Sequence, residues 1–296
     1  MQELLDHYIE YLKFEKRYSK HTITAYQKDL DQFITFYKSI STSESWQEVS
    51  NKNIRAWIAS IIEDGQSSRT ANRKLSCLKS FYQYLNKKNI FLQNPASLVT
   101  APKNKKTLPK FIDEKQINSL IDDVDFGDEF EGIRNHLIIS VFYHTGIRLS
   151  ELIELQQKDI DLEQGKIKVL GKRNKERIIP LDNEVTNLMK EYLSHRKTQL
   201  NGENCTYLFI TSKNKKLYPK LVYKIVNQSI GLVSTIKQKS PHVLRHTFAT
   251  HMLNHGADLN AIKELLGHAN LAATQIYTHT SFEKLKKAYQ QAHPRN

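Results

Sequence analysis

Side chains suited to work on a phosphate group recur in a few short segments of the sequence. His242 and Arg245 stand three residues apart, a spacing that places both on one face of a helix. Further along, His268 follows a glycine, and Tyr277 lies in an Ile-Tyr-Thr-His segment. Upstream, Arg148 follows a Thr-Gly turn at the start of a predicted helix. Together these residue types suit chemistry at a phosphodiester.

Each residue type has a distinct use in such chemistry. Two arginines can hold the non-bridging oxygens of a phosphodiester, where charge builds up in the transition state. A histidine can donate a hydrogen bond or move a proton, and Lys172, on a predicted turn, can protonate a departing alkoxide. A tyrosine hydroxyl can form a covalent phosphotyrosine when cations lower its pKa or a base assists. Taken singly, these residues are more typical of surface, capping or packing positions, so the prediction depends on their joint occurrence.

The second half of the chain is predicted to contain both helices and strands. Two alternating runs, 166–170 and 177–181, flank a basic turn and predict a two-stranded hairpin. The run 207–211 is a candidate third strand. Helical patterns cover about 114–124, 131–144, 150–156 and 182–199 and resume toward the C-terminus.

Residues 1–100 are predicted to form a small helical bundle. Ser19 is a candidate N-cap, and apolar residues recur after it at helical spacing. A second helical run carries Arg73 and Lys74 on a basic flank. Residues 101–110 hold two prolines and four lysines, with no acid, and are predicted to be a linker between this domain and a catalytic domain at 111–296.

Composition limits the classes of partner. The chain has 296 residues, with 44 Lys and Arg against 31 Asp and Glu, a formal net charge of +13 that indicates a polyanionic partner. No stretch approaches the roughly 18 apolar residues of a membrane span, and the start lacks the basic region of a signal peptide. The two cysteines, Cys77 and Cys205, are too few for a disulfide scaffold, so a cytoplasmic protein is expected.

In order and spacing, these motifs resemble those of the tyrosine recombinase (phage integrase) family. The resemblance lies in residues 145–152, 171–177, 242–251, 265–270 and 274–279. The segment 19–26 and the Arg-Lys-Leu-Ser run at 73–76 resemble the core-binding, SAM-like domain of that family. The resemblance implies a mainly α fold with a small antiparallel β-sheet: a helical SAM-like domain followed by a mixed α+β catalytic domain. The length and the C-terminal Ala-His-Pro-Arg are most similar to the bacterial Xer-type members.

The resemblance also implies roles for individual residues, and it implies no metal or nucleotide cofactor. Arg148 and Arg245 would clamp the scissile phosphate with His268 as a third donor, and Glu151 would support the arginines. Lys172 would be the general acid, although Arg173 and Lys175 lie close enough in sequence to be confused with it. His242 would assist proton transfer, and Tyr277 would be the nucleophile. Cations expected to contact DNA are Arg73, Lys74, Lys103, Lys105, Lys106, Arg173 and Lys175.

The partners implied are a duplex DNA recombination site and three further protomers of the same or a paired recombinase. A C-terminal helix with the apolar stripe Phe282, Leu285, Ala288 and Tyr289 would dock on a neighbouring protomer. Xer-type members resolve chromosome dimers with a DNA translocase of the FtsK type.

Other functions remain open on the sequence. A mobile-element integrase or transposase, and a type IB topoisomerase, would share the chemistry, and a degenerate relative would bind DNA without cutting it. A metal-dependent hydrolase would use two i,i+4 histidine pairs, His242 with His246 and His251 with His255.

Overall fold

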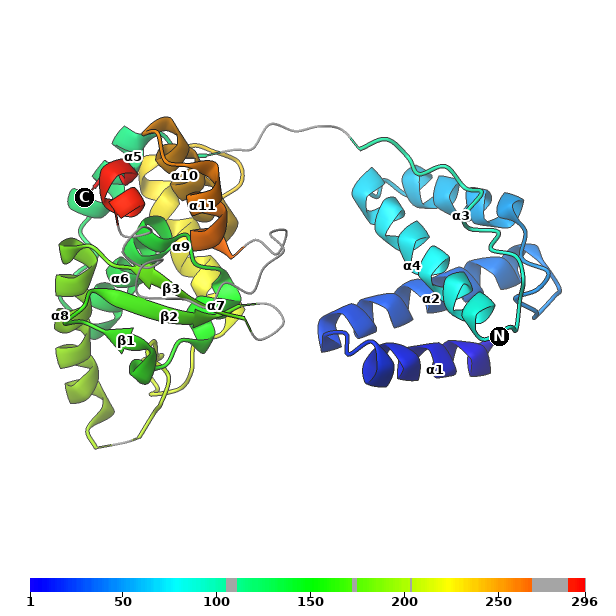
Figure 1. Ribbon diagram of the computed structural model, residues 1–296, viewed down its shortest axis with the longest axis horizontal. Coiled ribbons are helices and arrows are strands. Elements are labelled where there is room, and N and C mark those ends of the chain that lie inside the picture. Colours follow the sequence, from blue (N-terminus) through cyan, green and yellow to red (C-terminus); the bar gives the residue numbers. More distant parts are fainter. Residues whose placement is uncertain (105–110, 172–174, 203, 268–286, 296) are drawn as a thin grey trace. The chain divides into compact units, whose positions relative to one another are not determined.

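The computed structural model describes residues 1–104, 111–171, 175–202, 204–267 and 287–295. The chain divides into two compact units, Met1–Thr107 and Leu108–Asn296 (Figure 1). The boundary falls inside the segment that the sequence predicts to be a linker. Of the segment's described residues, Pro102 and Asn104 accept hydrogen bonds from the amide of Asn72, so this part packs against the N-terminal unit.

The N-terminal unit is helical, as predicted. Its elements are α1 (Gln2–Glu10), which continues into a π-helical turn η1 (Tyr11–Glu15), then α2 (Lys20–Ile40), α3 (Asn51–Glu63) and α4 (Ser68–Lys87). Serine side chains cap three of these helices; Ser19, for example, accepts a hydrogen bond from the backbone N–H of Thr22. The core is rich in aromatic rings, with Trp46 packed against Phe33 and Phe81 at centroid distances of 5.7 and 4.5 Å.

The C-terminal unit surrounds one buried helix. Helix α6 (Phe130–Thr145) is buried over most of its length and packs against four others. Those are α5 (Glu114–Asp122), α8 (Asn183–Leu200), α9 (Pro219–Val233) and α10 (Pro241–Asn254). Two short helices, α7 (Leu149–Glu154) and α11 (Leu259–Leu266), belong to the same unit and carry or flank the candidate site residues described below. The predicted helices at 114–124, 131–144, 150–156 and 182–199 are thus confirmed to within a few residues.

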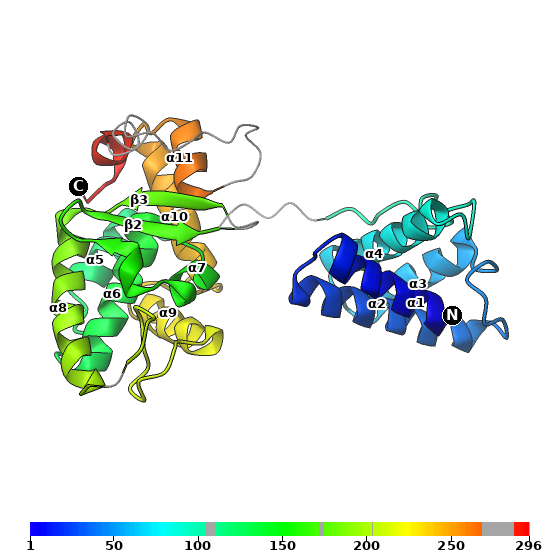
Figure 2. The same cartoon turned by 60° about the horizontal axis from the view of Figure 1, so that its bottom comes forward.

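A three-stranded antiparallel sheet lies in the same unit, and its predicted hairpin is confirmed. The strands are β1 (Ile160–Asp161), β2 (Lys166–Leu170) and β3 (Glu176–Pro180), in the order β1-β2-β3. Figure 2 shows β3 on the side of the sheet that faces α11. The N–H of Gly171 donates to the carbonyl of Lys175 at 2.7 Å, which closes the neck of the hairpin.

The prediction of a third strand at 207–211 is wrong. The third strand is β1, and the segment 207–211 makes only isolated bridges, at Tyr207 and Ile210. Its backbone bonds instead to side chains and to single loop residues. Arg196 donates to the carbonyls of Tyr207 and Leu208, the Tyr192 hydroxyl accepts from the N–H of Ile210, and the N–H of Leu208 donates to the carbonyl of Leu155. The apolar run is therefore buried without joining the sheet.

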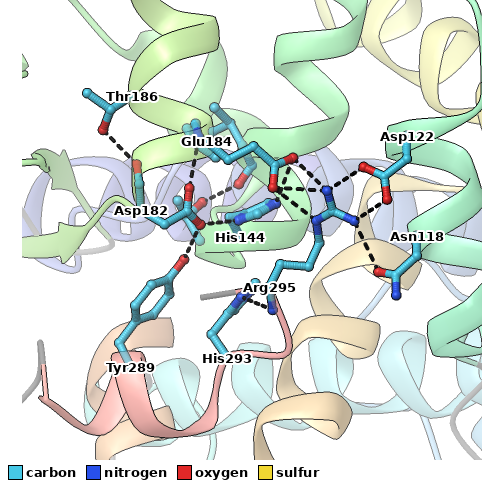
Figure 3. A network of polar contacts seen from close by, with 12 residues as sticks. Asn118, Asp122, His144, Asp182, Glu184, Thr186, Tyr289, His293 and Arg295 are labelled. Carbon is cyan, nitrogen blue, oxygen red and sulfur yellow. Dashed lines mark hydrogen bonds and ion pairs between the residues drawn. The ribbon is translucent and has the colours of Figure 1, made fainter.

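The described part of the C-terminus packs on its own unit. Residues 287–292 are helical, and the buried Tyr289 donates to Asp182 at 3.1 Å (Figure 3). Arg295, the penultimate residue of the sequence, forms ion pairs with Asp122 and Glu184. Tyr289 of the predicted exchange stripe therefore lies in this intramolecular contact and Ala288 is half-buried beside it, whereas Phe282 and Leu285 lie outside the described residues.

No helix in the described ranges is both long enough and apolar enough to cross a membrane.

Candidate active site

Arg148 is placed by the turn between α6 and α7. Helix α6 ends at Thr145 and is capped by Gly146, whose φ of 58° is a conformation that favours glycine. Two residues later, Arg148 is the N-cap of α7, and its backbone N–H donates to Oε2 of Glu151 at 2.9 Å. Its guanidinium donates to Oε1 of the same carboxylate at 2.7 Å and to the carbonyl of Gly267 at 2.9 Å. The side chain keeps 31% of its surface exposed, so part of the guanidinium remains open to a ligand.

Arg245 reaches the same place from α10. Its buried guanidinium donates to the carbonyl of Leu266 at 2.6 Å and to that of Gly146. Arg148 and Arg245 are therefore both anchored to the turn that ends α11 at Gly267. This arrangement brings together two arginines that lie almost a hundred residues apart in the sequence.

A third arginine, Arg177 on β3, was not assigned a role by the sequence analysis. It is buried, and its two terminal nitrogens donate to both oxygens of Glu151 at 2.9 and 2.8 Å. Its Nε donates to the carbonyl of Leu265 at 2.6 Å. The strand pattern could have predicted a structural role for Arg177, because Arg177 and the buried Ile179 share one face of β3. A charged residue on the buried face of a strand requires a buried partner of opposite charge.

Positive charge exceeds negative charge within this cluster. Burial would raise the pKa of Glu151, but the ion pair with Arg177 and the bonds from Arg148 outweigh burial and lower the pKa to about 2. Burial and the nearby guanidinium of Arg148 lower the pKa of Arg245 to about 9, so it stays charged at neutral pH. One buried carboxylate thus faces three guanidinium groups, an imbalance that an anion such as a phosphodiester would relieve.

Protonation of Glu151 is expected to weaken the fold in acid. Its pKa is about 2 in the folded chain, below the ordinary value of 4.5. The ion pairs therefore contribute fully to the free energy of unfolding above pH 4.5, and this contribution is lost as the pH falls toward 2. We expect Glu151→Gln to reduce the free energy of unfolding in urea more at about pH 6 than at about pH 3. The exposed Glu163→Gln is the control, and an equal loss for Glu151→Gln at both pH values would contradict the expectation.

His242 stands at the first turn of α10, three residues before Arg245. Partial burial and the charge of Arg245 lower its pKa, so the imidazole is neutral at neutral pH and offers a nitrogen lone pair. That state suits a group that accepts a proton.

Several predicted site residues lie outside the described residues: Lys172, Arg173, His268, Tyr277, Lys105 and Lys106. In sequence, Lys172 directly follows Gly171 at the hairpin neck, and His268 directly follows Gly267.

The predicted DNA-contact residues that the structure describes differ in accessibility. Lys103, Lys175 and Arg73 are exposed, and Arg73 is paired with Asp29. The prediction for Lys74 is wrong, because the residue is buried, bonded to Asp29 and placed over the Trp57 ring. Lys74 lies three residues after Ala71 and so belongs to the buried face of α4, which leaves its ammonium no access to a phosphate.

The histidines proposed for a metal-dependent hydrolase do not converge among the described residues. His251 is buried and bonded to the Tyr143 hydroxyl at 3.1 Å, and His255 pairs with Glu114 at 3.2 Å. His242 and His246 are exposed on α10.

Another group of possible metal ligands lies under the C-terminal segment. His144, Asp182 and His293 have ligand atoms within 4.8 Å of one another (Figure 3). The rings of His144 and His293 stack, with centroids 4.8 Å apart and planes at 26°. Stacked imidazoles direct their in-plane lone pairs side by side rather than toward one ion, so we interpret this group as part of the anchor of the C-terminus.

Comparison with known proteins identifies the family. The Phage integrase family matches residues 110–284, and the phage integrase N-terminal SAM-like domain matches residues 5–89. The tyrosine recombinase XerC of Bacillus licheniformis is 37% identical over 298 residues, which cover 100% of this chain and 97% of the relative. XerC of Thermodesulfovibrio yellowstonii is 38% identical over 298 residues, covering 99% and 97%.

Solved structures agree with this result. XerH site-specific recombinase, in a post-cleavage complex with a palindromic difH substrate, is similar with a TM-score of 0.70 and 26% identity, covering 90% of this chain and 78% of that one. The Tn1549 transposon integrase bound to transposon right end DNA shares the fold, with a TM-score of 0.72 and 19% identity, covering 97% and 98%. The chain therefore belongs to the phage integrase family and is a site-specific tyrosine recombinase of the XerC type.

Proposed function

We propose that the cluster around Glu151 is the phosphate clamp of this recombinase. The observation that carries the proposal is the anchoring of Arg148 and Arg245 to one turn, at the carbonyls of Gly267 and Leu266, beside a single carboxylate. Two fixed guanidinium groups can bind the two non-bridging oxygens of a scissile phosphate and stabilise the charge that develops on them. In this scheme His268, next in sequence to the turn, is a third donor.

The proposed reaction exchanges one phosphodiester for another. The Tyr277 hydroxyl oxygen attacks the phosphorus and passes its proton to the neutral His242, while the bond to the 5′-oxygen breaks. Lys172 gives a proton to that oxygen, which leaves as a hydroxyl. The product is a 3′-phosphotyrosyl enzyme, and attack by a 5′-hydroxyl reverses the steps and reseals a strand. The scheme uses no metal ion and no nucleotide.

We further propose duplex DNA as the substrate. The related XerH structure is a complex with its difH substrate. In this chain, the net charge of +13 is spread as +4 over residues 1–100, +4 over 101–110 and +5 over 111–296, so each part carries excess cations for phosphates. Arg73, Lys103 and Lys175, together with Lys105, Lys106 and Arg173, are the proposed contacts, and binding should weaken steeply as salt rises.

The biological task we propose is the resolution of chromosome dimers in the cytoplasm. The relatives named XerC match this chain over nearly its whole length, which supports that role over a mobile-element integrase or transposase. Four protomers, of this chain alone or with a paired recombinase, would bring two sites together and exchange strands in pairs through a Holliday junction. A DNA translocase of the FtsK type would be the further partner.

Mapping the covalent adducts on host DNA tests both the chemistry and the task. Purified protein is mixed with nicked genomic fragments, trapped with SDS, and the DNA ends joined to it are sequenced. We expect EDTA-resistant adducts at one chromosomal sequence that lies outside any mobile element. Adducts at the ends of mobile elements would favour the integrase or transposase alternative, and relaxation of a plasmid with a single site would favour a topoisomerase. Binding without any adduct would favour a non-catalytic relative.

A further inference from the structure

We propose that Arg177 is a positioning residue of the recombinase: it holds Glu151, and through it Arg148, in the orientation that grips the scissile phosphate. This inference rests on the clamp described under the proposed function and adds a residue that needs no contact with DNA. It also explains a buried charge that the reaction scheme leaves unused.

The first support is how the two oxygens of Glu151 are shared. Oε1 accepts from the side chains of Arg148 and Arg177 at 2.7 and 2.9 Å. Oε2 accepts from the backbone N–H of Arg148 and from Arg177 at 2.9 and 2.8 Å. Because Arg177 binds both oxygens from one side, the carboxylate presents only one to the Arg148 guanidinium. Without Arg177, only Arg148 would hold the carboxylate, which could then turn both oxygens toward the Arg148 guanidinium in a bidentate pair and withdraw that guanidinium from the phosphate.

The second support is the close approach of Arg177 to the end of α11. A Cβ built on Gly267 would lie 3.0 Å from Nη1 of Arg177 and 3.2 Å from its Cδ, so the guanidinium lies directly against this turn. Arg177 also binds the carbonyl of Leu265, and the next two carbonyls in the chain, those of Leu266 and Gly267, bind the clamp arginines. Arg177 therefore supports the turn on which the clamp is built.

The third support is the place of Arg177 on the hairpin. It pairs with Val169 in the β2–β3 register, close to the neck formed by Gly171 and Lys175. Lys172, the proposed general acid, belongs in sequence to the turn that this neck closes. Strand β3 follows the turn that contains the proposed general acid. Through Arg177, this strand is bonded to Glu151, the carboxylate that orients the clamp.

The test compares Arg177→Met with a matched control, Arg196→Met. Both arginines are buried and bind backbone carbonyls, but Arg196 binds those of Cys205, Tyr207 and Leu208 and, among the described residues, forms no hydrogen bond with the clamp residues. Binding to an intact half-site is measured together with single-turnover cleavage of two nicked duplexes. One duplex carries the normal scissile phosphodiester, and the other carries a neutral methylphosphonate at that position.

The two substrates separate positioning from general damage to the fold. A methylphosphonate has lost the charge that the clamp neutralises, so it depends less on a correctly placed Arg148. We expect Arg177→Met to slow cleavage of the phosphodiester about 100-fold and that of the methylphosphonate less than about 10-fold, with half-site binding within about 3-fold of wild type. Arg177→Lys can keep one ion pair to Glu151, so we expect it to cleave the phosphodiester about 10-fold more slowly than wild type. Arg196→Met should slow both substrates by the same small factor.

Specific outcomes would overturn the inference. The Arg177 variants could lose cleavage rate equally on both substrates, or Arg196→Met could lose it on the phosphodiester alone. Either result would mean that Arg177 acts only on stability. Should Arg177→Met fail to fold, the same substrate ratio measured with Arg177→Lys decides the matter. A wild-type protein that forms no covalent adduct would instead contradict the proposed function, whereas a normal wild type with an unchanged ratio in the Arg177 variants would contradict the positioning role alone.

Discussion

Tyr277→Phe is expected to abolish the covalent protein–DNA adduct while leaving DNA binding unchanged. The substitution removes a single oxygen, the atom that is proposed to bond to phosphorus, and keeps the ring. No other atom of the side chain can replace it as a nucleophile, so the loss should be complete rather than partial. The measurement is an SDS-resistant adduct on a suicide duplex nicked next to the cut site, with half-site binding followed by gel mobility.

The control for this experiment is Tyr289→Phe. Tyr289 is a C-terminal tyrosine whose hydroxyl is buried and bonded to Asp182, so it has no access to DNA. This variant should still form the adduct at a rate near that of wild type. A persistent adduct in Tyr277→Phe, or its loss in Tyr289→Phe alone, would refute the choice of nucleophile.

Lys172→Ala is expected to produce the second largest loss, about 10²- to 10⁴-fold in cleavage rate, the range typical of a missing general acid. The 5′-oxygen would then have to leave as an alkoxide. A substrate with sulfur in place of that oxygen leaves as a thiolate, which needs no proton because thiols are far more acidic than alcohols. Single-turnover cleavage of the 5′-phosphorothiolate duplex by Lys172→Ala should therefore approach the wild-type rate.

The control for Lys172→Ala is a second lysine of the same hairpin, Lys175. Lys175 is exposed, and its backbone carbonyl closes the hairpin neck, an interaction that Lys175→Ala retains. We expect Lys175→Ala to weaken DNA binding slightly and to cleave both substrates at similar rates. Rescue by sulfur in Lys175→Ala, and not in Lys172→Ala, would transfer the acid role to Lys175.

Local patterns in the sequence were enough to predict much of this protein. Apolar spacing located the main helices of both units, and Ser19 marked the start of α2 because capping depends on residues only three positions apart. Alternation located β2 and β3, and the motif order around Arg148, Arg245 and Tyr277 identified the family. The arginine roles and the identity of the general acid remain proposals.

Where sequence analysis failed, contacts between distant segments were responsible. The run 207–211 has the composition of a strand, but the side chains of Arg196 and Tyr192 and the isolated carbonyl of Leu155 bind its backbone instead of a neighbouring strand. Lys74 appeared to belong to a basic flank, yet Asp29 of α2 pairs with it inside the bundle. In both cases the partner lies on another element, which periodicity along one segment cannot reveal.

The sequence by itself determined the family, the two-part organisation of helices and hairpin, and which residue types are available for phosphate chemistry. Only the tertiary structure decided how those residues are held. Arg245 binds a carbonyl 99 residues away and Arg148 one 119 residues away, while Arg177 joins Glu151 across 26 residues. Charged groups can be buried in this way only when the fold brings their partners within hydrogen-bond distance, and packing sets those distances.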